Sequence, residues 1–481
     1  MFILFPTQLF RNFSLLKNKQ VYIVEEPYYF TRLKFHKLKI AFHRATMKKY
    51  FDDLISKNIN VKYIPFYKVK DFYKKHKNKN AEIYHPIDLP LLNNIKKQFQ
   101  LTIHPTLNMT FTHLDTDEYF NIAFKNNNFS HHEFYKHQRI KLDILMKENK
   151  PIKNKWSFDE QNRYTFPDNI DIPHIGRNRT NDYIQKAIQY TNKHFNNNYG
   201  SLEHFIYPIS LSEARRWLRQ FLKERLNNFG KYQDAVHSNI PFGFHSLLSP
   251  LMNVGLLTDM EVINISDKYY NNNKKHIRLP SYEGFIRQII GWRNFVYLVY
   301  LTKGTQMYNQ NFLNHRRQLG NKYKQLWEGT TEMPVINDII HKIVKYGYAH
   351  HIERLMYLGN YLLINQFHPK QVYKLFMEWN IDSYDWVMIP NVFGMSQYSD
   401  GGIMMTRMYF SSSNYIANMS NYTRRKNEDW WVIWDAIYYH FINRHQNILR
   451  SNYATSRQVA HWDRKSNKDK NDTIALAQKY I

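Results

Sequence analysis

The chain has 481 residues, of which 43% are hydrophobic and 22% charged, a composition that predicts two or three folded domains and excludes a disordered protein. The formal net charge of +27 favours a polyanionic partner, nucleic acid ahead of an anionic membrane. The chain has no cysteine, which excludes disulfides, thiolate catalysis and cysteine-ligated metal centres. No apolar run reaches the roughly 18 residues that span a bilayer. We therefore expect an intracellular protein without membrane contact, in the cytoplasm or nucleus, or virion-associated if it is viral.

The first 125 residues alternate short apolar runs with stretches of helical periodicity, which predicts a Rossmann-like α/β domain with a parallel sheet. The opening MFILFPTQLF has no basic residue before its apolar run and predicts a first strand, not a signal peptide. No GxGxxG follows this strand, so the dinucleotide fingerprint is absent. The predicted strands are Phe2–Phe5, Val21–Val24, Val61–Phe66, Glu82–His85 and Leu101–His104, and the predicted helices are Leu33–Leu54 and Leu91–Gln98.

The remainder of the chain divides into a polar stretch and a helical part. Residues 126–201 are rich in Asn, Lys and His and contain several prolines, which predicts an interdomain linker. Residues 202–481 are dominated by long amphipathic segments, which predict a large all-α domain. Its predicted helices are Leu211–Phe229, Glu283–Leu301, Asn337–Tyr346, Ile352–Asn365, Pro369–Trp379 and Trp430–Arg450.

Two segments of the helical part could bind phosphates. In HSLLSPLMNVGLLT, residues 245–258, hydroxyls precede a helix that starts at Pro250, and the free N–H groups at such a start can hold a pyrophosphate. EGFIRQIIGWRNF, residues 283–295, carries two arginines on a Trp-bearing helix, which suits a flavin or a DNA backbone. Taken alone, the first segment is also explained as a simple helix cap and the second as a buried amphipathic helix.

Two further segments carry polar residues that can do chemistry. YAHHIERLMYLGN, residues 348–360, places His351 and Arg354 on one helical face. DSYDWVMIPNVFGMSQYSDGG, residues 382–402, predicts a loop held in place by polar contacts of Asp385 and Asn391, because it is too apolar for a plain connection. The adjacent histidines, taken alone, are equally explained as structural residues.

In this order and spacing, the four segments resemble the flavin and lesion pocket of the photolyase/cryptochrome family, and within it the bacterial (6-4) photolyases that carry an iron–sulfur cluster. The phrases HHIERLM and PNVFGMSQYSDGG carry the resemblance, and residues 21–50 extend it to the N-terminal part. The resemblance implies a Rossmann-like N-terminal domain and a large all-α FAD-binding domain. It also implies a monomer that repairs UV-damaged DNA with light.

The resemblance implies a set of FAD contacts. Tyr232 would close over the cofactor, Arg354 and Asp385 would form a salt bridge beside the flavin ring, and Asn391 would face the flavin N5 and tune its redox states. The residues implied at the FAD phosphates are His245, Ser246, Leu247, Leu248 and Ser249.

The resemblance also implies the catalytic and substrate-binding residues. His351 matches the histidine that donates a proton to the (6-4) lesion, and histidine suits this role because it titrates near neutral pH. Tyr409 and Gln288 would line the lesion pocket together with His350, and the lesion would be flipped out of the duplex to reach them. His351, Tyr409 and Asn391 are the expected catalytic residues.

The sequence departs from the family pattern at the metal centre and along the electron path. The positions of the four cluster cysteines hold Val335, Thr423, Lys426 and Val432, so no iron–sulfur cluster is expected, and Trp430, Trp431 and Trp434 are expected to fill its space. Electron transfer is expected to use Trp327 at the surface. The inner aromatic pair is replaced by Leu375 and Phe376, so the path needs Trp379, Tyr373 or another aromatic residue.

The resemblance also implies a possible antenna chromophore of the ribityl-lumazine or deazaflavin type, but the usual contact residue is replaced in this chain. Bacterial relatives use the Asp of a GDQL motif for it, whereas this chain reads PTQL, with Thr7 in that place. Glu25 or Glu26 are the remaining candidate contacts.

Other functions stay open at this point. The chain could instead repair cyclobutane dimers, with His351 only contacting the lesion, or could be a cryptochrome-like blue-light receptor that binds FAD without repair. The 31 residues after Arg450 form no Ser/Gly-rich tail, which favours the enzyme over the receptor. A plain basic DNA-binding protein is the simplest alternative, but it leaves the segment around Asp385 and Asn391 unexplained.

Overall fold

The N-terminal part of the protein is an α/β layer built on a parallel sheet. The computed structural model describes residues 1–175, 177–425 and 428–481. The sheet has the strand order β3-β2-β1-β4-β5, and Phe2 of the central strand is paired with Val21 on one side and Glu82 on the other. This confirms the Rossmann-like prediction and, within a few residues, the predicted strands. The strands are β1 (Phe2–Leu4), β2 (Val21–Val24), β3 (Val61–Ile64), β4 (Asn80–Tyr84) and β5 (Gln100–His104).

Helices connect and cover these strands, as right-handed parallel crossovers require. The predicted helix over Leu33–Leu54 starts later, because His36 caps it by accepting a hydrogen bond from the Leu38 amide at 3.0 Å. The helices of this layer are α1 (Pro27–Phe30), α2 (Lys37–Ile55), α3 (Val69–His76) and α4 (Leu89–Lys96).

The chain crosses between the two parts of the molecule more than once. Helix α5 (Thr116–Ala123) packs on α6 (His131–Lys141), and both contact α13 (Asn294–Tyr308) of the helical part. Helix α7 (Asp182–His194) then returns to lie against α2 of the α/β layer. Residues 126–201, which sequence predicts as a linker, therefore contribute a helix to each part. Short hairpins precede and follow α6: β6–β7 (Phe124–Lys125, Asn128–Phe129) and β8–β9 (Met146–Lys147, Lys150–Pro151).

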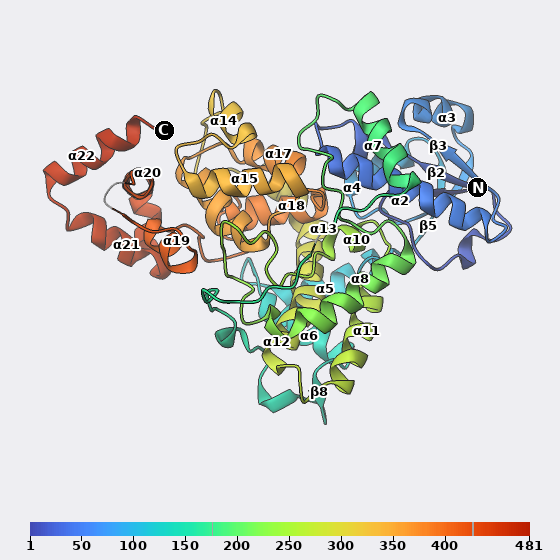
Figure 1. Ribbon diagram of the computed structural model, residues 1–481, viewed down its shortest axis with the longest axis horizontal. Coiled ribbons are helices and arrows are strands. Elements are labelled where there is room, and N and C mark those ends of the chain that lie inside the picture. The colour runs from blue at the N-terminus through green and yellow to red at the C-terminus, as the bar shows by residue number, and fades with distance from the viewer. Residues whose placement is uncertain (176, 426–427) are drawn as a thin grey trace.

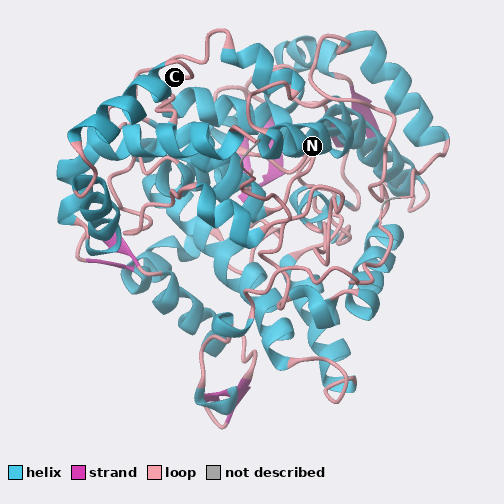
Figure 2. Cartoon of the chain, turned by 60° about the vertical axis from the view of Figure 1, so that its left-hand side comes forward, coloured by secondary structure: helices cyan, strands magenta, loops and turns pink. Residues whose placement is uncertain are grey.

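The rest of the chain is helical, in agreement with the predicted all-α domain. Figure 1 shows the sheet at the right, α20–α22 at the left and the β8–β9 hairpin at the lower tip, and Figure 2 shows how helices dominate the whole. The helices are α8 (Leu211–Glu224), α9 (Leu226–Phe229), α10 (Ser249–Asn253), α11 (Asp259–Asn272), α12 (Leu279–Ile286), α14 (Lys322–Glu328), α15 (Pro334–Tyr346), α16 (Asn360–Ile364), α17 (Pro369–Trp379), α18 (Asp385–Ile389), α19 (Ser413–Met419), α20 (Trp430–Ser451), α21 (Tyr453–Asp463) and α22 (Asn467–Gln478).

Wide, π-helical turns interrupt the helical part where the sequence places site residues. They are η6 (Arg287–Arg293), η7 (Glu353–Gly359) and η8 (Pro390–Ser396), and their second residues are Gln288, Arg354 and Asn391. The loop predicted over residues 382–402 is thus largely helical, formed by α18 and η8. Turns of this kind occur frequently at functional sites.

Segments η7 and η8 contact each other closely. A Cβ atom at Gly359 would overlap Ser396 Oγ and the carbonyl oxygen of Arg354, so only glycine allows this approach. Gln397 Nε2 also donates to the Gly359 carbonyl at 3.1 Å. The two segments that carry Arg354 and Asn391 are therefore held together. Among the described residues, no helix is both long and apolar enough to cross a membrane.

Candidate active site

The two adjacent histidines at the start of η7 face different environments. Glu353 is fully buried; its carboxylate accepts the His350 backbone N–H at 3.0 Å and forms a buried ion pair with Lys342. His350 is consequently held inside, where its ring stacks on that of His245 at 4.6 Å. The atoms His245 Nε2 and His350 Nδ1 are buried and have no hydrogen-bond partner in the described part of the chain, so this site could satisfy a polar ligand.

His351 lies in a different environment from buried His350. Its side chain is exposed, yet desolvation, aided by the positive charge of Arg354, lowers its pKa to about 4. A pKa of about 4 favours the neutral form of His351 at pH 7 and lies below the near-neutral value expected from the sequence.

Arg354 forms its ion pair with Asp382 and not with Asp385, so the predicted salt bridge is wrong. The Arg354 Nη1 and Asp382 Oδ1 atoms are 2.9 Å apart. Ser249 Oγ donates to Asp382 Oδ2 at 2.6 Å, and Asn253 Nδ2 donates to the Asp382 carbonyl at 3.0 Å. Asp382 thus links η7 to the start of α10, which is the segment predicted to bind phosphates.

Asp385 is instead buried at the contact between the α/β layer and α17–α18. Arg32 binds both of its carboxylate oxygens, at 2.7 and 2.9 Å, and the hydroxyls of Tyr28 and Tyr373 also donate to it. Because these donors saturate its oxygens, Asp385 has none to spare for a cofactor. Its position at the first residue of α18 turns it toward Arg32, whereas Asp382, before the helix, faces Arg354.

In the segment from His245 to Ser249, the groups available to a ligand are mainly backbone atoms and serine hydroxyls. Leu247 and Leu248 are buried, so their side chains belong to the core, and Leu247 has a left-handed backbone (φ 54°) that reverses the chain. Trp217 Nε1 donates to the Ser246 carbonyl at 2.9 Å, which fixes the segment from outside. Tyr232 stacks on Phe244 at 5.6 Å and is itself buried.

The remaining predicted side chains are half-buried and available. Asn391 Nδ2 donates to the Val387 carbonyl at 2.7 Å, so its carbonyl oxygen is the group it can offer to a ligand. Gln288 and Tyr409 are also half-buried. Desolvation raises the Tyr409 pKa, and the positive charges of Arg407 and Arg163 oppose this shift.

Asp234 is a partly buried carboxylate that the sequence analysis did not single out. It is half-exposed, and desolvation together with the nearby charge of Asp159 raises its pKa to about 6. Arg163 and Arg287 also lie within electrostatic reach of it. Its place two residues after Tyr232, in FGKYQDA, was the available signal.

Comparison with known proteins identifies the family of this chain. Residues 2–207 match the family model described as deoxyribodipyrimidine photo-lyase-related protein. Over 355 residues the chain is 34% identical to a (6-4) photolyase of Agrobacterium fabrum, an alignment that covers 72% of this chain and 69% of the relative. This chain belongs to the photolyase/cryptochrome family.

Solved structures agree with this membership at the level of the fold. A class III photolyase of Agrobacterium tumefaciens superposes over 100% of this chain and 97% of its own, with a TM-score of 0.55 and 12% identity. A cryptochrome of Synechocystis superposes over 100% and 99%, also with a TM-score of 0.55 and 12% identity. At this identity the likeness concerns the fold alone.

In this family member, the two predicted electron-transfer tryptophans are connected through a tyrosine. The ring of Tyr199 lies 4.4 Å from that of half-buried Trp327 and 6.1 Å from that of fully buried Trp379. Tyr199 comes from the Asn-rich stretch before α8 and was not predicted. Leu375 and Phe376 are buried in α17 and leave this photolyase relative without an oxidisable residue at those two positions.

Trp430 and Trp434 are buried in the region expected to replace the iron–sulfur cluster, and Trp431 is half-buried. Val335 is buried, Val432 is 38% exposed, and Lys426 lies outside the described residues. Trp430 Nε1 donates to the Thr423 carbonyl at 3.2 Å, but both residues line a cavity of about 480 Å³. The expected filling of this space by tryptophans stays a prediction. The described residues contain no group of three or more His, Asp or Glu that could hold a metal.

The predicted antenna contacts are engaged within the protein. Glu25 accepts hydrogen bonds from the Tyr63 and Tyr190 hydroxyls, both at 2.6 Å, and from the Phe66 amide at 3.0 Å, and it forms an ion pair with Arg44. Glu26 accepts from Tyr73, and desolvation raises the Glu26 pKa to about 7. Thr7 is fully buried. Glu25 acts as a structural residue at the end of β2, and it has no free oxygen for a chromophore.

Proposed function

We propose that this protein is a light-driven DNA photolyase that uses FAD, and that its substrate is the (6-4) pyrimidine photoproduct. The observation that carries the proposal is the exposed His351 side chain at the start of the segment whose Arg354 pairs with Asp382 at 2.9 Å. A (6-4) photoproduct must have a hydroxyl group moved between two bases, which needs a proton donor beside the lesion. The name of the 34% identical relative supports the same substrate.

The residues at the site fit a flavin nucleotide. The unpartnered ring nitrogens of His245 and His350, the carbonyl oxygen of Asn391 and the charged pair of Arg354 and Asp382 offer both donors and acceptors. A solved archaeal photolyase with this fold, from Sulfolobus tokodaii, contains two FAD molecules, and it covers 100% of this chain with a TM-score of 0.51 at 12% identity. A bound, reduced flavin would supply an electron to the lesion when illuminated.

The chain's own residues would orient the lesion and manage its proton. Tyr409 and Gln288 would bind the flipped-out bases, and a ring nitrogen of His351 would hold the proton that the lesion takes up. The phosphates of bound DNA add negative charge near His351, which opposes the lowering of its pKa by desolvation. Substrate binding would thereby help His351 gain the proton that it lacks in the free protein.

The test is light-dependent repair by protein purified in the dark. The absorption spectrum is recorded first, and the protein is then illuminated with oligonucleotides that carry either one (6-4) photoproduct or one cyclobutane dimer, with dark samples as controls. A flavin spectrum with repair of the (6-4) lesion alone is the expected result. Repair of the cyclobutane dimer would change the substrate, bound flavin without repair would favour a blue-light receptor, and absence of flavin would overturn the site.

A further inference from the structure

A lysine-bearing hairpin projects from the body of the molecule near α6 and α12. Strands β8 and β9 pair antiparallel, with Met146 opposite Pro151, and form the lower tip in Figures 1 and 2. Lys147, Lys150 and, just after β9, Lys153 are exposed. The hairpin acid Glu148 lies 3.9 Å from Lys147 and is 84% exposed, so it neutralises little of this positive charge.

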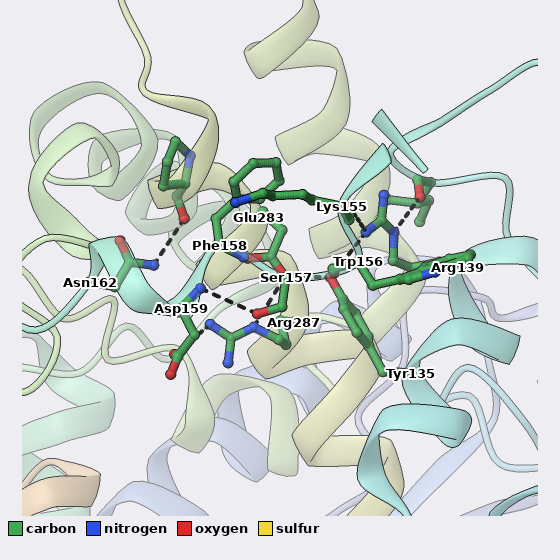
Figure 3. Close-up of polar contacts among 12 residues, drawn as sticks. Tyr135, Arg139, Lys155, Trp156, Ser157, Phe158, Asp159, Asn162, Glu283 and Arg287 are labelled. Atoms are coloured by element: carbon green, nitrogen blue, oxygen red, sulfur yellow. Dashed lines mark hydrogen bonds and ion pairs between the residues drawn. The ribbon is translucent and has the colours of Figure 1, made fainter. Parts of the chain in front are cut away.

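A single buried arginine fixes both ends of this hairpin. Arg139, 1% exposed, donates to the carbonyls of Ile144 (3.2 Å) and Leu145 before it, and of Lys155 (3.3 Å) and Trp156 (2.9 Å) after it (Figure 3). No ion pair to an acid forms with Arg139 in the described part of the chain, and desolvation lowers its pKa. Because the buried guanidinium donates to backbone carbonyls on both sides of the hairpin, it holds the two ends of the hairpin together.

The hairpin also adopts backbone conformations that are unfavourable for ordinary residues. Left-handed φ angles occur at Leu145 (56°) and Lys153 (56°), in addition to Glu148 and Asn149 (51° and 59°) at the turn. The turn pair is common in tight hairpins, but Leu and Lys rarely adopt this conformation. Such strain persists only where the surroundings fix the backbone, and it concentrates at functional segments.

The segment that follows the hairpin, residues 157–163, is held against η6 and α12 by polar contacts. Buried Glu283 accepts the Phe158 N–H at 3.1 Å, and Arg287 Nη2 pairs with Asp159 at 2.9 Å (Figure 3). Asp159 then pairs with Arg163 at 2.6 Å, and Arg163 lies within electrostatic reach of Tyr409. The segment therefore carries exposed lysines at one end and is joined at the other to Arg287 of η6, the residue before Gln288 of the predicted lesion pocket.

We infer that the β8–β9 hairpin binds the phosphate backbone of duplex DNA beside the lesion, with Lys147, Lys150 and Lys153 as the contacts. This inference rests on the proposed function, because DNA in the pocket would bring flanking duplex to the hairpin. Lysine is a mobile point charge that pairs with phosphates without reading bases, so the contact is independent of sequence. It would add affinity that depends strongly on salt.

The first test is charge reversal. A variant with Lys147→Glu, Lys150→Glu and Lys153→Glu is compared with one carrying Lys70→Glu, Lys74→Glu and Lys75→Glu on α3, which makes the same change in net charge on the opposite side in Figure 1. Binding to a long undamaged duplex is measured over a range of salt concentrations. We expect the hairpin variant alone to bind weakly, with a salt slope reduced by about one per lost phosphate contact. Equal losses in both variants, or no loss, would overturn the inference.

The second test locates the contact and is independent of repair. Because the chain has no cysteine, Lys150→Cys creates a unique thiol for a DNA-cleaving reagent, and Lys74→Cys provides the control. We expect cuts at a fixed distance from a central lesion with Lys150→Cys only. Random cuts would show that the hairpin has no fixed place on DNA, and hairpin-dependent binding to anionic vesicles but not to DNA would reassign the partner. If flavin and repair are absent while hairpin-dependent duplex binding persists, only the proposed function fails.

Discussion

Arg354 pairs with Asp382 at 2.9 Å, and the same carboxylate accepts the hydroxyl of Ser249 at 2.6 Å. This relationship joins the η7 segment to the start of α10, two regions more than 100 residues apart in the chain. Asp382 therefore joins the segments that are proposed to hold the cofactor, while Asp385 belongs to the contact between the two parts of the molecule.

The first prediction separates these two aspartates. Asp382→Asn should weaken flavin binding by about 1.5–3 kcal/mol, because it removes a hydrogen-bonded charge beside the ligand. Asp385→Asn should leave flavin affinity nearly unchanged but lower the melting temperature, because it breaks the contacts of Arg32 and Tyr373. Flavin titration and thermal melting measure both effects, and the reverse pattern would restore Asp385 to the cofactor site.

The second prediction concerns the protonation of His351. Its pKa of about 4 means that only a small fraction carries a proton at neutral pH, and this fraction falls as pH rises. Repair at low substrate concentration should therefore slow as pH rises from about 5 to 8, if His351 is the acid. His351→Ala should keep the flavin spectrum and lose repair. Any repair that remains in this variant should lack the pH dependence. Full repair by the variant would show that His351 is not the acid.

The third prediction tests the aromatic path. Tyr199→Phe should slow blue-light reduction of the bound flavin in the presence of an added thiol, because phenylalanine is much harder to oxidise than tyrosine. Tyr323→Phe is the matched control, since Tyr323 lies 5.3 Å from Trp327 but not between the two tryptophans. The flavin absorption under illumination gives both rates. Equal rates in the two variants would exclude a relay through Tyr199.

The fourth prediction concerns the buried ion pair that positions His350. Glu353→Gln should destabilise the protein by about 3–5 kcal/mol, because it leaves the Lys342 charge buried without its partner. A double variant, Lys342→Met with Glu353→Gln, should recover part of this loss, since no unpaired charge remains. Chemical denaturation followed by fluorescence measures the difference. If the single variant is as stable as the wild type, the pair has no structural role.

The sequence predicted the sheet well because buried parallel strands are short apolar runs between helical patterns, as at Val21–Val24. It failed where a choice depended on three-dimensional packing. Asp382 and Asp385 lie in one short segment, and only the start of α18 decides which of them faces Arg354. Tyr199 lies in a polar stretch with no local pattern, so its place between two tryptophans could not be predicted.

The return of the chain from α6 to α7 has a consequence for cleavage of the polypeptide. The described parts of this connection, residues 165–175 and 177–181, are largely exposed, and a protease would be expected to cut there first. The N-terminal fragment would keep α5 and α6, which pack against α13, and the C-terminal fragment would keep α7, which packs against α2. Each fragment thus packs against the other through two separate contacts. A protein cleaved once in this connection should therefore elute as a single species in gel filtration until denaturant separates the two fragments.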